Sequence, residues 1–185
     1  LKVKIMFPMV GTLTELREAK GMLGEARRQL RQEGVGFNEE MEVGIMIEVP
    51  SAVAVADQLA REVDFFSIGT NDLTQYVMAA DRGNARVAAL ASAFQPAVLR
   101  NVRDAAEAAH AAGIRIGMCG ELAGNPLATP VLLGLGLDEL SMSAPAIPAV
   151  KEAVRGLTMA DARRIAGEAL ACESSEAVLD LLKSR

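Results

Sequence analysis

The sequence predicts an α/β fold built around a parallel sheet. Five short apolar runs alternate with segments of helical periodicity, which is the pattern of repeated strand–helix units. Each run ends in small or polar residues, as strands do where they leave a sheet. Aromatic residues make up 3% of the 185 residues and Trp is absent, so the core must be aliphatic. An aliphatic core suits near-continuous apolar strands covered by helices.

The predicted elements follow one another without a linker, a repeat or a low-complexity segment, so we expect one domain over residues 1–185. The chain begins directly before a strand-like run, and we expect it to be part of a longer protein. The strands are expected at residues 3–9, 43–49, 64–68, 114–119 and 139–142. The helices are expected at residues 12–33, 51–61, 96–112, 147–155 (or from 145), 158–171 and 174–183.

The first helix carries the clearest local signals. Thr12 and Glu15 have the spacing of a capping box, and Gly34 is placed to end the helix. Apolar residues then recur every three or four positions and predict one apolar face, made of Leu16, Ala19, Leu23, Ala26 and Leu30. Thr158 and Asp161 repeat the capping-box spacing in a later helix.

Composition and charge exclude several classes of function. The formal net charge of -5 leaves no basic stripe for nucleic acid, because the arginines at 27, 28 and 31 alternate with acids. No apolar run approaches the roughly 18–20 residues that span a bilayer. No signal peptide is present, so a cytoplasmic location is expected. The common nucleotide-binding glycine motifs are absent, and one His without a Cys cluster excludes zinc.

Two carboxylates lie where the second and third strands end. In parallel α/β folds, the loops at the carboxyl ends of strands build the functional site. Glu48 ends an apolar strand and Asp72 follows the next one, where an unpaired carboxylate would be costly. Two hard oxygen ligands suit Mg²⁺, which takes one or two carboxylates plus substrate oxygens and water. The alternative is that one of them caps a helix.

The turn at residues 69–72 also has a phosphate-binding interpretation. Gly69 lets backbone N–H groups approach an anion, and Asn71 adds amide donors. Such turns are common, so the motif alone is weak. Arg82 is a candidate for a bidentate phosphate contact, and its alternative is a surface salt bridge with Asp81 or another neighbour.

A cysteine and a histidine are the remaining candidates for chemistry. Cys119 lies at a strand end, with open space left by Gly117 and Gly120, so it is either a catalytic thiol or a small buried apolar residue. Cys172 has no such setting and is interpreted as structural. His110 is the single histidine and lies between alanines, which favours a helix-face residue over a phosphorylated one.

The residues also carry a resemblance to a known family. Residues 64–76, which read DFFSIGTNDLTQY, resemble the signature of phosphoenolpyruvate-utilising enzymes. Within that family the chain is most similar to the Enzyme I branch of the bacterial sugar phosphotransferase system, at residues 5–9, 46–50, 81–84, 117–124 and 136–143. The resemblance covers essentially the whole chain. The sequence differs from the family pattern at Asn125, where an acidic residue is more usual, and it is only loosely similar to that pattern at residues 91–95.

The resemblance implies a (β/α)8 TIM-type barrel, of which this chain holds the last five βα units. It implies that Glu48 and Asp72 bind Mg²⁺ and that Asn71 and Arg82 hold the phosphate. Cys119 would protonate the enolate carbon as pyruvate forms. The phosphoryl acceptor would be a histidine on a separate, swivelling N-terminal domain, which passes it to a histidine phosphocarrier protein. The resemblance also implies a homodimer. We expect the chain alone to be inactive, because that histidine is missing.

Three alternatives stay open at this stage. The first is a dikinase-type or synthase-type relative that uses the same substrate site. The second is a module that senses phosphoenolpyruvate without turnover, which would not need a thiol acid at Cys119. The third is a plain five-stranded, doubly wound sheet, which rests on strand count alone.

Overall fold

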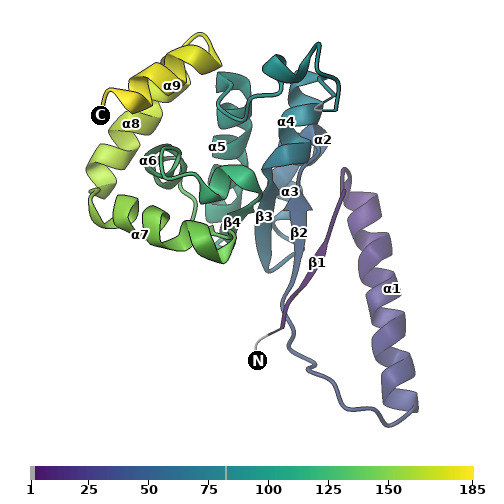
Figure 1. The fold of residues 1–185 in the computed structure, drawn as a ribbon. Coiled ribbons are helices and arrows are strands. Elements are labelled where there is room, and N and C mark those ends of the chain that lie inside the picture. The colour runs from purple at the N-terminus through teal and green to yellow at the C-terminus, as the bar shows by residue number, and fades with distance from the viewer. Residues whose placement is uncertain (1–2, 82) are drawn as a thin grey trace.

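A computed structural model describes residues 3–81 and 83–185 and confirms the α/β class (Figure 1). Five strands form one parallel sheet, and they lie in the sheet in their order along the chain. The strands are β1 (Ile5–Phe7), β2 (Val43–Ile47), β3 (Phe65–Gly69), β4 (Arg115–Cys119) and β5 (Glu139–Leu140). Each lies within a predicted apolar run or extends one residue beyond it, and most are shorter than predicted.

Helices and short turns connect and follow the strands. The α-helices are α1 (Leu13–Gln32), α2 (Pro50–Ala54), α3 (Ala56–Leu59), α4 (Thr70–Met78), α5 (Pro96–Ala111), α6 (Thr129–Gly134), α7 (Ile147–Arg155), α8 (Met159–Ala171) and α9 (Ser175–Lys183). Three 3-10 turns are η1 (Ala88–Leu90), η2 (Glu121–Gly124) and η3 (Ala144–Ala146). Within residues 3–81 and 83–185, none of the helices is both long enough and apolar enough to cross a membrane.

Two helical predictions were wrong. The continuous helix expected at 51–61 is broken at Val55, whose φ of -119° and ψ of 22° lie outside the helical range. The segment after β3, interpreted as a turn, forms α4. Its first residues, Thr70, Asn71 and Asp72, have modest helix propensity, so the helical signal at its start is weak. The six-residue helix α6 was also not predicted.

The capping box predicted for α1 is present. The Glu15 backbone N–H donates to Thr12 Oγ1 at 3.2 Å, and Glu15 Oε2 accepts from the Thr12 backbone N–H at 3.0 Å. The backbone N–H of Gly11 also donates to this carboxylate, and it is the largest cause that lowers the pKa of Glu15. Gly34, at a φ of 70°, follows the end of the helix as predicted.

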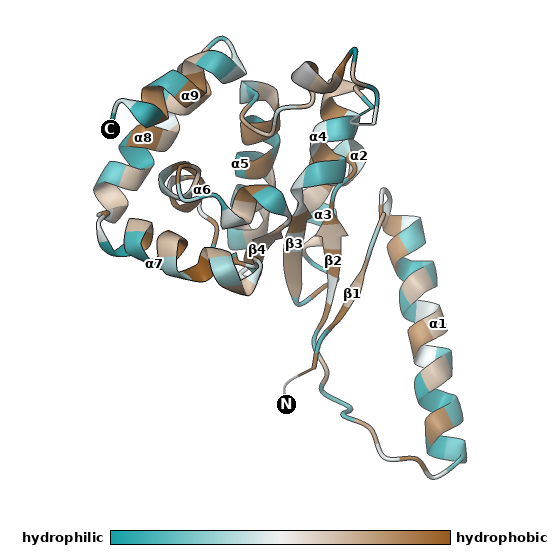
Figure 2. Ribbon diagram, in the orientation of Figure 1, coloured by the Kyte–Doolittle hydropathy of each residue, from teal (hydrophilic) through white to brown (hydrophobic). Residues whose placement is uncertain are grey.

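The predicted apolar face of α1 is only partly buried. Leu16 is fully buried, whereas Leu23 and Leu30 are half-buried and Ala26 is exposed. The rest of α1 stands away from the other helices, and apolar residues recur along it (Figures 1 and 2). The Arg17 guanidinium joins the first turns of α1 to Glu62 by donating hydrogen bonds of 3.0 and 2.7 Å to the Glu62 carboxylate. These hydrogen bonds lower the pKa of Glu62.

The core lies on one face of the sheet. Alternate residues of the three central strands are buried and face α2, α4 and α5: Ile45, Ile47, Phe66, Ile68, Ile116 and Met118. The ladder aligns them, because Phe66 pairs with Ile45 and with Ile116. The opposite face carries smaller and more polar residues, among them Ser67 and Cys119, and it lines a cavity of about 290 Å³.

The closest helix contact in the C-terminal half is between α6 and α8. A Cβ atom added at Gly134 would overlap the backbone carbonyl oxygen of Ala162 and would lie 2.7 Å from the Ala166 Cβ. The two helices can therefore approach each other only because residue 134 has no side chain. Gly167, in the same helix α8, has nothing within 4 Å of its Cβ position.

We predict that Gly134→Ala lowers the free energy of unfolding by about 1–3 kcal/mol, because α8 must move away from α6. The matched change Gly167→Ala should raise it by about 0.5–1 kcal/mol through helix propensity. Urea unfolding followed by circular dichroism measures both. Equal effects of the two substitutions would contradict the helix contact described above.

Candidate functional site

The predicted site residues converge because three parallel strands end at one edge of the sheet. The ladder pairs Ile47 with Ile68, and Gly69 with Cys119. Glu48 follows β2 directly, and Cys119 is the last residue of β4. Asn71 and Asp72 lie in the first turn of α4, which starts immediately after β3. The strand register therefore places these side chains at the carboxyl edge.

Glu48 is a buried carboxylate held between two neighbouring segments. Its side chain is 3% exposed, and Oε1 accepts the backbone N–H of Met9 at 2.7 Å. Met9 has a φ of 55°, which is uncommon for a residue other than glycine. On the other side, a Cβ at Gly69 would lie 2.7 Å from Glu48 Oε2. The carboxylate thus occupies the space that a side chain at residue 69 would fill.

Glu48 and Asp72 are hard oxygen donors of the kind that Mg²⁺ takes. Glu48 and Asp72 come from consecutive strand ends, and Glu48 Oε2 lies over the bare backbone of Gly69. Among the described residues there is no group of three or more His, Cys, Asp or Glu side chains suited to a metal. Two carboxylates completed by substrate oxygens and water is an arrangement that Mg²⁺ commonly takes.

An open cleft brings Asn71 and Cys119 together. Its volume is about 520 Å³, and its lining includes Asn71, Cys119, Glu121, Ser141 and Ser143. The last three follow β4 and β5. Glu48 and Asp72 are not among the described residues that line this cleft. The structure therefore joins the Asn71 and Cys119 side chains in one cavity, and the two carboxylates are not part of its lining.

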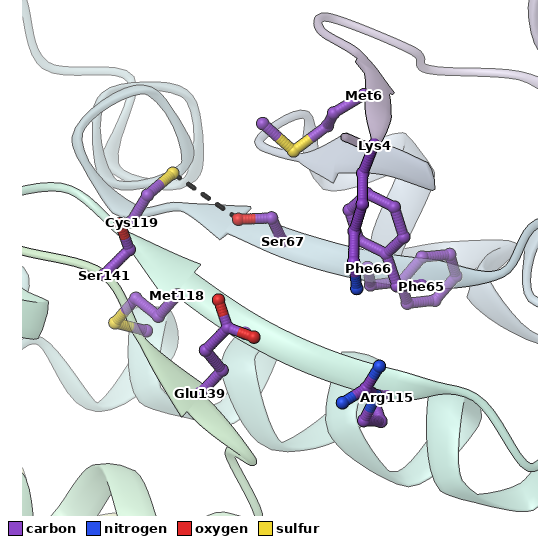
Figure 3. Close-up of a pocket in the computed structure, with 11 residues that line it drawn as sticks. Lys4, Met6, Phe65, Phe66, Ser67, Arg115, Met118, Cys119, Glu139 and Ser141 are labelled. Atoms are coloured by element: carbon purple, nitrogen blue, oxygen red, sulfur yellow. Dashed lines mark hydrogen bonds between the residues drawn. The ribbon is translucent and has the colours of Figure 1, made fainter. Parts of the chain in front are cut away.

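The thiol of Cys119 has two hydrogen-bonding neighbours on β3. Ser67 Oγ donates to Cys119 Sγ at 3.6 Å, and the thiol donates to the carbonyl oxygen of Ile68 at 3.5 Å (Figure 3). Thr70, which is fully buried, donates from Oγ1 to the Cys119 carbonyl oxygen at 3.3 Å. Neither Ser67 nor Thr70 was predicted from the sequence as a site residue. A signal for Ser67 was its period-2 spacing from Gly69, which puts both on one strand face.

Gly120 makes the turn that follows the thiol. Its φ of 106° and ψ of -178° belong to a region that is essentially restricted to glycine. A Cβ at this position would also lie 2.7 Å from Thr70 Oγ1. Both features require glycine here, and both fix how the chain leaves β4 beside the cleft.

Comparison with known proteins agrees with this architecture. Residues 1–159 match the profile of the family described as "PEP-utilising enzyme, PEP-binding domain". The chain belongs to the PEP-utilising enzymes.

Individual relatives share about half of its residues. The phosphoenolpyruvate-protein phosphotransferase of Staphylococcus carnosus (strain TM300) is 50% identical over 182 residues, which is 98% of this chain and 32% of that protein. The protein of the same name from Priestia megaterium gives the same identity and coverage. That from Geobacillus stearothermophilus is 50% identical over 181 residues, with 98% and 31% covered. The chain thus spans about a third of the length of these relatives.

The remaining candidates of this PEP-utilising chain lie elsewhere. Arg82 lies outside the described residues. His110 is in the last turn of α5, as a helix-face residue, and its Nε2 lies 3.1 Å from Asp138 Oδ2. Cys172 caps α8, and its thiol donates to the Glu168 carbonyl oxygen at 3.4 Å. Neither His110 nor Cys172 lines the cleft described above.

We predict that Gly120→Ala lowers the free energy of unfolding by about 1–3 kcal/mol, because alanine is strained at this φ and its methyl group collides with Thr70. Gly124→Ala is the matched control in the lining of the same cleft, since its Cβ would meet its nearest neighbours at 3.4 Å. That change should stay within about 0.5 kcal/mol. Urea denaturation of both variants tests this, and a neutral Gly120→Ala would argue against the turn.

Proposed function

We propose that this chain is the C-terminal part of a phosphoenolpyruvate-binding (β/α)8 barrel in a phosphoenolpyruvate-protein phosphotransferase. The barrel would bind phosphoenolpyruvate with Mg²⁺, pass the phosphoryl group to a protein histidine and release pyruvate for the sugar phosphotransferase system. One observation carries the proposal: Asn71 and Cys119, an amide donor and a thiol, line a single cleft at the carboxyl edge of the sheet, the edge at which the carboxylates Glu48 and Asp72 also follow their strands.

The order of the strands supports the barrel. A doubly wound sheet reverses its strand order at a switch point. The described sheet runs from β1 to β5 without a reversal. Its buried apolar face packs on helices, whereas the other face carries residues such as Ser67, Gly117 and Cys119 and lines a cavity. In a closed barrel this second face would be the interior.

Glu48 and Asp72 would hold the metal. Mg²⁺ supplies positive charge that polarises and orients the phosphoryl group during transfer. The bond between Glu48 and the Met9 N–H fixes the first carboxylate before any ligand binds. Asp72 is held by its place in the first turn of α4.

Asn71 would contact the phosphate. It lies in the first turn of the nine-residue helix α4, where backbone N–H groups and the helix dipole favour an anion. Its side-chain amide borders the cleft. Arg82 stays a prediction as the second phosphate contact, because its position is not described.

Cys119 would complete the reaction as a general acid. Cleavage of the P–O bond to the substrate leaves its electron pair on oxygen, as the enolate of pyruvate. The thiol S–H bond then breaks, and its proton joins the methylene carbon through the enolate double bond. A methyl group forms, and the negative charge passes to sulfur. The position of Cys119 in the lining of the cleft supports this role.

The acceptor histidine must come from outside the chain. His110 is the single histidine of the sequence, and it pairs with Asp138, which precedes β5. Asp138 also accepts the backbone N–H of Ile116, near the start of β4. His110 therefore lies at the amino edge of the sheet, opposite the cleft. This supports an acceptor on a separate domain and onward transfer to a histidine phosphocarrier protein. The homodimer stays a prediction.

We predict that phosphoenolpyruvate binds to the complete protein in a Mg²⁺-dependent manner, measured by isothermal titration calorimetry. Asp72→Ala should raise the Kd by at least about tenfold, because one of two protein ligands to the metal is lost. Asp57→Ala is the control. Asp57 is an exposed acid of α3 that forms an ion pair with Arg61, so its replacement should leave the Kd unchanged.

Binding that is indifferent to Mg²⁺ or to Asp72→Ala would refute the metal assignment. The same titration of residues 1–185 alone separates two further cases. Retained binding would show that the site assembles from these five units. Binding seen only in the complete protein would show that the upstream strands are required.

We predict that Cys119→Ala lowers the rate of pyruvate formation by at least about 100-fold, because a general acid is lost. Calorimetric binding of phosphoenolpyruvate should change little in this variant. Cys172→Ala is the matched control and should turn over normally. A Cys119→Ala variant with normal turnover would exclude the thiol as the acid and would favour a sensing module.

A further inference from the structure

We propose that Ser67 is a positioning residue for Cys119: its hydroxyl orients the sulfur and stabilises the thiolate that remains after the thiol gives up its proton. This inference rests on the proposed function, in which Cys119 is the acid. It adds a residue from the neighbouring strand β3 to the proton-transfer step.

Two glycines allow the two side chains to meet. In the parallel ladder Ser67 pairs with Gly117, and Gly69 pairs with Cys119. All four residues lie on the same face of the sheet, because side chains alternate between the two faces along a strand. Gly117 and Gly69, which occupy the other two positions, place no side chain between the hydroxyl and the thiol. Ser67 Oγ therefore reaches diagonally across the ladder to Cys119 Sγ at 3.6 Å (Figure 3).

The two hydrogen bonds at the sulfur have different roles in the proton transfer. The bond from the thiol to the Ile68 carbonyl oxygen, 3.5 Å long, directs the S–H proton before substrate arrives. That bond must break when the proton moves to carbon. The bond from Ser67 to sulfur does not involve this proton, so it can persist through the step. It strengthens as sulfur becomes anionic, because hydrogen bonds to charged acceptors are the stronger ones.

The setting of Cys119 makes such a donor useful. The thiol is half-buried at the junction of two cavities, both of which it lines. An anion in a partly buried site is costly unless a hydrogen bond compensates it. When the S–H electron pair stays on sulfur and the enolate double bond takes the proton, the new charge lies 3.6 Å from the Ser67 hydroxyl oxygen.

The test measures thiol reactivity in the complete protein without substrate. Alkylation by iodoacetamide is followed against pH, and peptide mass spectrometry separates Cys119 from Cys172. Ser67→Ala should slow alkylation of Cys119 at neutral pH about five- to tenfold, because the thiolate loses a hydrogen bond. Cys172, whose thiol bonds to its own helix, should react at an unchanged rate.

A second pair of variants isolates the hydroxyl from its packing. Ser67→Thr and Ser67→Val have nearly the same shape and differ in one hydroxyl group. The proposal requires near-normal alkylation of Cys119 in Ser67→Thr and slow alkylation in Ser67→Val. Equal rates in this pair, or a Ser67→Ala profile that overlays the parent profile, would overturn it. The Thr and Val pair decides the matter even where Ser67→Ala folds poorly.

Turnover separates this proposal from the proposed function. Ser67→Ala should lower kcat for pyruvate formation about five- to tenfold and leave KM for phosphoenolpyruvate unchanged, with recovery in Ser67→Thr. If Cys119→Ala turned over normally, the acid role would fall. The alkylation profile would still report whether Ser67 governs the thiol.

Discussion

The parallel register of β2, β3 and β4 is the constraint on which the site depends. It is fixed by the buried face, where Phe66 pairs with Ile45 and with Ile116. A shift of one residue would turn Phe66 and Ile68 out of the core and bury Ser67 under the helices. The hydrophobic effect on one face therefore decides the position of every polar group on the other. The packing of the buried face therefore sets the geometry of the site, and the site residues themselves contribute little to that packing.

Close approach of backbone and side chains is the second requirement of the carboxyl edge. Glu48 can lie across the end of β3 because Gly69 has no Cβ, and the chain can turn past Thr70 because Gly120 has none. A site built on strand ends and a helix start is also more rigid than one built on long loops.

The amino edge of the sheet carries charge pairs that have a structural role. Lys4 Nζ lies 2.5 Å from Glu42 Oε2 and 4.9 Å from the centre of the Phe65 ring. His110 and the backbone of Ile116 share the carboxylate of Asp138. Partly exposed pairs of this kind contribute little stability each. They join segments that lie at the starts of neighbouring strands.

The sequence by itself determined the alternation of strands and helices, the capping box at Thr12, the N-cap at Thr158, the family and the residues at the strand ends. These signals act over a few neighbouring residues, so they can be read locally. The tertiary structure alone decided that α1 buries its apolar face only in part, and that Ser67 contacts Cys119. That contact joins residues 52 positions apart. The contact exists because the strand register brings the two side chains together. The register depends on the packing of the whole sheet, and the neighbours of each residue in the sequence do not predict the contact.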